Sequence, residues 1–240
     1  MTVMKAMKTV VRAERIKLTH SFTGKVPLAA SMLTLFLATF LMPGVYAAAG
    51  AWNWWYILML HGMLAVFCYF SVGKDKKVHY YHSLSLATEP WKCWLGKVTY
   101  CALALFFSNL FIFTGTLGCH MLFGTTIPVA NGLAGALLLS ITCLWEIPFY
   151  LFLSVRFGMT GTVLTGIILP LAVTAGIADG PLWWLHPAAI PVRLMCPVLK
   201  ILPNGILLES ASPLNDAGVI WPGVFLSLLW FVMFTGITAI

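Results

Sequence analysis

Charged residues are concentrated in short segments of this chain, and long apolar stretches separate these segments. Four stretches contain no Asp, Glu, Lys or Arg: residues 26–73, 98–145, 157–178 and 217–240. The first two are 48 residues long, and the others are 22 and 24 residues long. A membrane-spanning helix needs about 20 predominantly apolar residues, so each 48-residue stretch predicts two spans and each shorter stretch predicts one. The spans are expected near 26–43, 55–73, 98–121, 133–155, 158–178 and 219–239.

Six transmembrane helices predict an all-α membrane protein with a single transmembrane domain over residues 1–240. The composition agrees, since 60% of the residues are hydrophobic and only 9% are charged, against about 45–50% and about 25% in soluble domains. A soluble core of this size cannot bury so much apolar surface. A soluble enzyme, a nucleic-acid-binding domain and a disordered chain are therefore excluded. Alternating period-two strands are absent, which argues against an outer-membrane barrel.

The distribution of Lys and Arg predicts the orientation of the chain in the membrane. Of the 14 Lys and Arg residues, all but Arg193 and Lys200 lie before the first span, between spans two and three, or between spans four and five. Because short cytoplasmic segments are enriched in Lys and Arg, these three segments are expected in the cytoplasm. Both termini are then cytoplasmic, and the net charge of +7 is an orientation signal that implies no nucleic-acid partner.

Residues 3–18 predict an amphipathic helix that lies flat on the inner leaflet. The segment has no continuous apolar region, so it is not a cleavable signal peptide. At 100° per residue, its basic and apolar side chains fall on opposite faces. The basic face contains Lys5, Lys8, Arg12 and Arg15, and the apolar face contains Val3, Met4, Met7, Val10, Val11 and Leu18. The alternative is a short juxtamembrane helix whose charges only enforce the topology.

The predicted cytoplasmic loop 74–97 combines charges with aromatic residues. The pair Glu89-Pro90 ends any preceding helix, and a loop so rich in Tyr, Trp and His suggests a docking surface for a cytoplasmic protein. The expected contact residues are Tyr80, Tyr81, Glu89, Pro90 and Trp91. The alternative is an interfacial helix whose Trp side chains lie among the headgroups.

The predicted outer segment 179–218 contains Pro191, Pro197 and Pro203 at six-residue spacing. Proline limits helix length, so short helices at 191–196 and 197–202 are expected, ended by Asn204-Gly205. The segment either presents a functional surface or forms a structural lid. On the same side of the membrane, an aromatic belt is expected, formed by Trp52, Trp54, Trp55 and Tyr56.

The sequence contains none of the common catalytic, metal or nucleotide motifs. It has no His-Glu-x-x-His, no Cys-x-x-Cys and no phosphate-binding Gly-x-x-x-x-Gly-Lys-Ser/Thr. His79 and His82 have i, i+3 spacing, but no Cys or carboxylate pair stands near them to complete a metal site. Cys119 and Cys196 are the only cysteines that could meet on the oxidising side, and a disulfide is not expected. We therefore expect no catalytic, cofactor-binding or metal site, and any ATP must be bound by a partner.

Glu146 is the one charged residue that falls inside a predicted span. A carboxylate at the bilayer centre costs about 2.5–3.5 kcal/mol on insertion scales. Its side chain is therefore expected to face the bundle, a partner subunit or water. It acts either as a polar contact between helices or as a proton site.

Several segments together resemble the permease subunit of a type-2 ATP-binding cassette exporter. Residues 13–18 (AERIKL) are similar to the entry helix of these permeases, and 84–86 (LSL) with 94–97 (WLGK) are similar to their coupling loop. Residues 148–158 (PFYLFLSVRFG) and 191–205 (PVRLMCPVLKILPNG) resemble segments of the lantibiotic-immunity branch. The similarity covers nearly the whole chain.

The resemblance implies a membrane subunit that removes a lantibiotic from the membrane of the bacterium that produces it. The implied partners are a cytoplasmic ATP-binding subunit dimer at the 74–97 loop, a second similar permease or another copy of this chain, membrane lipid and the peptide. The chain itself is then not an enzyme, and it lies in the bacterial cytoplasmic membrane. Trp183, Trp184 and His186 are the side chains expected to face the peptide. The alternatives are an exporter of another peptide or lipid-like antibiotic, and a non-transporting membrane scaffold or sensor.

Overall fold

A computed structural model describes residues 3–19, 21–77, 89–124 and 126–239. These residues form helices and no strand, apart from one isolated bridge between Ile201 and Leu207. The α-helices are α1 (Val3–Thr19), α2 (Val26–Leu41), α3 (Ala47–Trp54), α4 (Leu60–Lys77), α6 (Pro90–Phe123), α7 (Val129–Thr142), α8 (Glu146–Gly176), α9 (Ala189–Leu199) and α10 (Ile220–Thr238). Four 3₁₀ turns are η1 (Phe22–Lys25), η2 (Gly44–Tyr46), η4 (Trp183–Leu185) and η5 (Ala217–Val219), and η3 (Trp55–Met59) is π-helical.

Five helical segments in the described part of the chain are long and apolar enough to cross a membrane. They are Phe22–Leu41, Gly44–Lys76, Pro90–Phe123, Glu146–Thr174 and Ala217–Thr238. Two shorter apolar helices are α7 and α9. The described part of the chain therefore has the all-helical architecture of a membrane protein, as the spacing of charges predicts.

Helix α8 is folded back on itself at Gly158. This residue has φ 68° and ψ −160°, which are not helical angles. The hydroxyls of Ser154 and Thr162 lie 3.3 Å apart, and a Cβ built on Gly166 would lie 3.6 Å from the hydroxyl of Tyr150. Both pairs are symmetric about Gly158. Residues 146–157 and 159–176 are thus two antiparallel helices joined at one residue, which agrees with the boundary expected between spans four and five.

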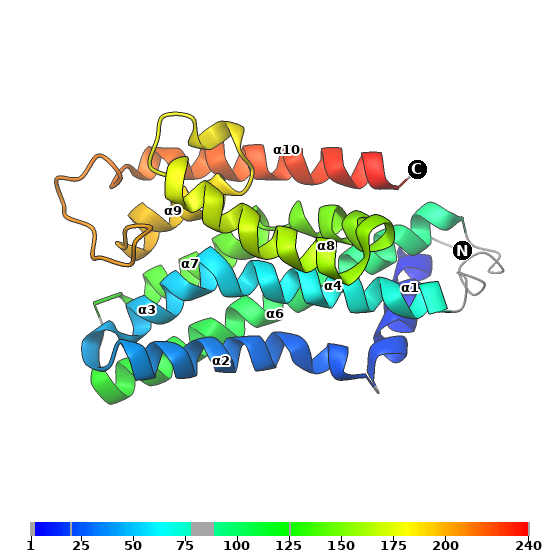
Figure 1. Cartoon of the computed structure of the whole chain (residues 1–240), viewed down its shortest axis with the longest axis horizontal. Helices are drawn as coiled ribbons and strands as arrows, with labels where there is room; N and C mark the ends of the chain where they lie inside the picture. The colour runs from blue at the N-terminus through cyan, green and yellow to red at the C-terminus, as the bar shows by residue number, and fades with distance from the viewer. Residues whose placement is uncertain (1–2, 20, 78–88, 125, 240) are drawn as a thin grey trace.

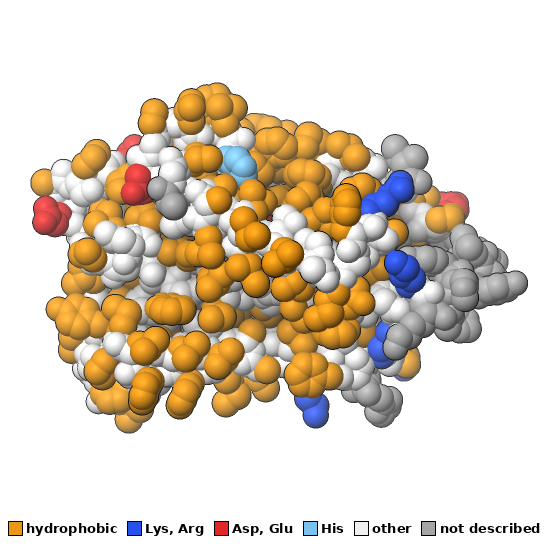
Figure 2. Space-filling model, in the orientation of Figure 1, with side chains coloured by type: hydrophobic (Ala, Val, Ile, Leu, Met, Phe, Trp, Pro, Cys, Tyr) orange, Lys and Arg blue, Asp and Glu red, His pale blue; other side chains and the backbone are white. Residues whose placement is uncertain are grey.

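The long helices lie side by side, and α1 crosses their ends (Figure 1). Both termini lie at the α1 end, whereas α9 and the loop that follows it lie toward the other end (Figure 1). Figure 2 shows Lys and Arg side chains gathered at the α1 end and most of the visible Asp and Glu at the opposite end. Apolar side chains cover the surface between them, as the predicted membrane region requires.

The predicted outer helices 191–196 and 197–202 are wrong, because α9 is one continuous helix from Ala189 to Leu199. Pro191 lies in its first turn, where the backbone N–H would have no helical partner in any case. Pro197 lies in the last turn and removes one hydrogen bond. The helix ends at Lys200, which adopts a left-handed conformation with φ 60°.

The predicted aromatic belt is also largely wrong. Trp52, Trp55 and Tyr56 are buried in the bundle, and the indole N–H of Trp55 donates to Asn109 Oδ1 at 2.8 Å. The helix α3 begins at Ala47, before these aromatic residues, and α3 and η3 together place them inside the bundle. Both ends of the predicted loop 74–97 are helical, since α4 continues to Lys77 and α6 begins at Pro90, a favoured residue for the first helical position. Residues 78–88 of this segment lie outside the described residues.

We predict that Gly158→Ala destabilises the protein by roughly 1–3 kcal/mol. A Cβ at this position would meet no described atom within 4 Å, so the expected loss comes from the backbone conformation alone. Gly118→Ala is the matched control, because its site is equally open and its backbone is helical. Thermal unfolding in detergent measures both variants. Equal melting temperatures would contradict the proposed requirement for glycine.

Candidate functional site

Four charged side chains form a closed ring at the α1 end of the bundle. Lys17 Nζ lies 2.6 Å from Glu14 Oε1 and 3.0 Å from Asp75 Oδ1. Lys97 Nζ lies 2.8 Å from Glu14 Oε2 and 2.8 Å from Asp75 Oδ2. Each lysine therefore bridges both carboxylates, and each carboxylate uses one oxygen for each lysine. We call these residues the charge ring.

The charge ring joins three helices, and three of its four members are buried, whereas the Lys17 side chain is 30% exposed. Glu14 and Asp75 are each 4% exposed, and Lys97 is 7% exposed. Glu14 and Lys17 come from α1, Asp75 from the end of α4, and Lys97 from the first part of α6. Burial acts to lower the pKa of Lys17, but the hydrogen bonds and charges of the two carboxylates outweigh it, so that the pKa is raised.

Two further hydrogen bonds tie the same elements together. Lys97 Nζ also donates to the backbone carbonyl of Ser71 at 3.1 Å, and Lys74 Nζ donates to the backbone carbonyl of Lys17. A cavity of about 130 Å³ lies beside the ring and is lined in part by Pro90, Cys93 and Trp94. The ring and the first turn of α6 thus line the same cavity.

The sequence patterns above do not predict the charge ring, although its two acidic residues stand out among the many basic residues around them. Glu14 and Asp75 are two of only three acidic residues in the segments expected in the cytoplasm. Acidic residues that stand among many basic ones are natural partners for them. Which lysine pairs with which acid depends on the packing of helices, because Glu14 and Lys97 are 83 residues apart.

The predicted docking residues follow directly at the start of α6. Pro90 is its first residue, and Glu89 is its N-cap. Glu89 is exposed, accepts a hydrogen bond from Trp91 Nε1 at 2.6 Å and lies 3.1 Å from Lys92 Nζ. The hydrogen bonds from Lys92 and Trp91 lower the pKa of this carboxyl group. Tyr80 and Tyr81 lie outside the described residues, as do His79 and His82.

Glu146 faces His61 inside the bundle, and both side chains are buried. His61 Nδ1 lies 2.8 Å and 2.9 Å from the two carboxylate oxygens. Its other nitrogen, Nε2, lies 2.9 Å from the backbone carbonyl of Tyr56. The contact joins α4 to the first residue of α8.

The geometry of the His61–Glu146 pair requires one proton between His61 Nδ1 and the Glu146 carboxyl group, in addition to the proton on Nε2. A carbonyl oxygen only accepts hydrogen bonds, so Nε2 carries a proton that it donates to Tyr56. The second hydrogen bond then needs a proton either on Nδ1 or on the carboxyl group. In the first case the pair is an imidazolium and a carboxylate, and in the second both groups are neutral. Tyr56 lies in the π-helical turn η3. Such turns are rare in proteins, and those that occur are often found at functional sites.

The predicted outer segment 179–218 is fixed by side chains that bond backbone carbonyls, one within the segment itself and two from the rest of the bundle. Arg193 Nη1 donates to Leu214 at 2.7 Å, and Asn131 Nδ2 donates to Val198 at 2.8 Å. Asn53 Nδ2 donates to the carbonyl of Pro203 at 3.1 Å and to the Tyr56 hydroxyl at 3.0 Å. All residues of α9 are buried. These contacts are those expected of a structural lid.

The three predicted peptide-facing residues do not share one environment. Trp184 is 45% exposed and stands between two other exposed apolar side chains, Leu182 and Leu185. Trp183 is partly buried and packs against the core. His186 is half-buried, and burial lowers its pKa. Only Trp184 among the three therefore presents a large apolar surface.

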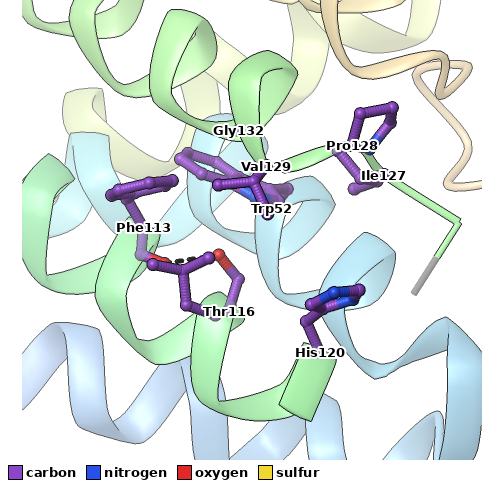
Figure 3. A pocket seen from close by; sticks show the side chains of 10 residues that line it. Trp52, Phe113, Thr116, His120, Ile127, Pro128, Val129 and Gly132 are labelled. Atoms are coloured by element: carbon purple, nitrogen blue, oxygen red, sulfur yellow. Dashed lines mark hydrogen bonds between the residues drawn. The ribbon is translucent and has the colours of Figure 1, made fainter. Parts of the chain in front are cut away.

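A small cavity lies near the C-terminal end of α6 (Figure 3). Its volume is about 20 Å³, which is room for one water-sized molecule. His120 lies at one side of it, and Trp52 and Phe113 lie at another (Figure 3). The cavity is too small for a side chain of a peptide.

The described residues contain no group of three or more His, Cys, Asp or Glu side chains arranged to hold a metal ion. All six cysteines are free thiols. Cys119 lies 3.9 Å from the hydroxyl of Thr39, whereas Cys196 bonds within α9. No protein-family model, curated protein or solved structure matches this chain.

We predict that Lys97→Met destabilises the protein by about 3–5 kcal/mol, the usual cost of breaking a buried ion pair. The substitution leaves two buried carboxylates that share only Lys17. Lys92→Met is the control, because it breaks only the exposed pair with Glu89, and solvent-exposed ion pairs contribute little to stability. Denaturant unfolding in detergent compares the two. A small, equal loss in both would show that the ring contributes little.

We predict a non-additive result for the His61–Glu146 pair. Glu146→Leu leaves His61 Nδ1 without a partner and should cost about 1–3 kcal/mol, whereas Glu146→Gln offers an amide donor and should be tolerated. The double variant His61→Leu/Glu146→Leu removes both polar groups and should lose less stability than the sum of the single leucine variants. Additive losses in this double-mutant cycle would contradict the contact.

Proposed function

We propose that this chain is the membrane-spanning subunit of an ATP-binding cassette exporter that removes a lantibiotic from the producer's membrane. ATP is bound by a separate cytoplasmic subunit dimer. The proposal takes the family resemblance of the sequence as its premise, and the geometry supports it at three places: the topology, the α1 end and the outer surface.

The topology supports six spans with both termini in the cytoplasm. The hairpin at Gly158 divides α8 into two antiparallel helices, and α7 leads into the first of them. Both termini lie at the end that carries most of the visible Lys and Arg (Figures 1 and 2), which is the pattern of a cytoplasmic face. An even number of crossings is consistent with termini at one end.

The charge ring is the single observation that carries the proposal. It joins α1 to α4 and α6, the two helices that flank the predicted docking loop. A partner that docks at Glu89, Pro90 and Trp91 would move the start of α6. Because the ring is closed and Glu14, Asp75 and Lys97 are buried in it, that movement would be passed to α1 and to the end of α4 together. This is the mechanical connection that an ATP-driven membrane subunit needs.

The outer end offers the surface that would meet an amphipathic peptide. Leu182, Trp184 and Leu185 are exposed beside α9, where a peptide already bound in the outer leaflet would approach. Asn53 bonds both the outer segment and the Tyr56 hydroxyl, and the Tyr56 carbonyl accepts from His61. The outer segment is thereby connected to the intramembrane His61–Glu146 pair.

We predict that Glu89→Lys disrupts docking of the ATPase without disturbing the fold. Glu89 is exposed, and its ion pair with Lys92 is a surface contact that contributes little to stability. A reversed charge at an interface costs several kcal/mol when it faces a like charge, so copurification of the ATPase should fall at least about tenfold. Glu209→Lys is the control, because it makes the same charge change at an exposed position near the other end.

Three measurements on these variants separate the candidate functions: copurification of the ATPase, ATP hydrolysis stimulated by peptide, and growth in the presence of a lantibiotic. The proposal requires Glu89→Lys to lower all three while Glu209→Lys leaves copurification of the ATPase unchanged. Hydrolysis stimulated by another peptide or a lipid-like antibiotic identifies a different exporter. No associated ATPase at all identifies a scaffold or sensor.

A further inference from the structure

A groove of about 880 Å³ runs along the outside of the bundle from α1 down the face of α6. Its upper part is lined by the basic side chains of Lys8, Arg12 and Arg15 on α1. Its lower part is lined by apolar residues of α2 and α6, among them Leu28 and Phe107. We call this the α1 groove.

The two parts of the α1 groove differ in chemistry. The three cations are exposed, and none of the described residues that line the groove is acidic. Glu14, the acidic residue nearest to them in sequence, is turned into the charge ring on the other face of α1. The upper part therefore attracts an anion.

The apolar part follows one ridge of α6. Leu103, Phe107 and Phe111 are spaced four residues apart, and they are 43%, 53% and 42% exposed. From Thr99, where the ridge begins, to Phe111 is twelve residues, or about 18 Å of helix. One leaflet of the hydrocarbon core is about 15 Å thick, half of the total. The ridge is long enough to accompany one acyl chain through its leaflet.

We propose that the α1 groove binds one anionic phospholipid, with its phosphate among Lys8, Arg12 and Arg15 and an acyl chain along Leu103, Phe107 and Phe111. The three basic side chains favour an anionic headgroup, and the length of the apolar ridge matches that of a lipid acyl chain. A soluble anion would contact only the upper part. The proposal is independent of any transport activity, because it depends only on the residues that line this groove.

Native mass spectrometry of the purified full-length chain tests the proposal. Phosphatidylglycerol and phosphatidylcholine with identical acyl chains are added, and the lipid retained per chain is counted. The wild type should retain one phosphatidylglycerol in preference to phosphatidylcholine. The variant Lys8→Gln/Arg12→Gln/Arg15→Gln should lose this preference, with a roughly fivefold weaker retention for each charge removed.

Matched controls distinguish a defined site from general attraction. Lys25→Gln/Lys76→Gln/Arg156→Gln removes the same charge from exposed positions outside the groove and should retain the lipid as the wild type does. Leu103→Trp fills the apolar part and should abolish retention with all cations in place. Leu171→Trp is its control, since Leu171 is 42% exposed and lies outside the groove. Thermal unfolding verifies that each variant is folded.

Four outcomes would overturn the proposal. Equal losses in both charge variants would mean general electrostatic attraction, and full retention in Leu103→Trp would mean that no acyl chain occupies the groove. Displacement of the lipid by millimolar glycerol phosphate would mean a site for a soluble anion. A shift from dimer to monomer in the groove variants, with lipid retention unchanged, would mean that a second copy of this chain covers this face.

Discussion

The closed ring of Glu14, Lys17, Asp75 and Lys97 is the constraint on which the α1 end of this protein depends. Two opposite charges buried alone would be costly, because desolvation often exceeds the attraction between them. Here each charge has two partners, and the ring as a whole is neutral. Removing any member leaves an uncompensated buried charge. The position of α1 across the ends of α4 and α6 is thereby specified by geometry that an apolar contact would not supply.

Inside the bundle, buried polar and charged side chains also have partners, but in smaller groups than the charge ring. His61 and Glu146 satisfy each other, and the Tyr56 carbonyl accepts the remaining imidazole N–H. Trp55 and Asn109 form a second such pair, and Asn109 also bonds Ser140. An unsatisfied polar group in hydrocarbon costs several kcal/mol, so these contacts fix which faces of α4, α6, α7 and α8 meet.

At the end of the bundle opposite α1, by contrast, three polar side chains pair with backbone carbonyls. These carbonyls belong to the segment 179–218, which has little regular structure outside α9. Arg193, Asn131 and Asn53 each satisfy carbonyl groups that a helix or sheet would otherwise pair. The result is a fixed cap over the bundle that exposes only a few apolar side chains, Trp184 among them. The aromatic residues Trp52, Trp55 and Tyr56 serve the core beneath this cap instead of the membrane interface.

The sequence by itself determined the class of protein, the apolar segments, the amphipathic character of α1 and the boundary at residues 156–158. These are local properties, because helix periodicity and hydropathy are written in neighbouring residues. It also marked Glu146 as a carboxylate inside an apolar segment, expected to face the bundle, a partner subunit or water. Only the tertiary structure decided that the partner is His61, 85 residues away, and that Lys97 closes a ring with Glu14 and Asp75. Such pairs depend on which helix faces meet, and that choice arises from the packing of the whole bundle.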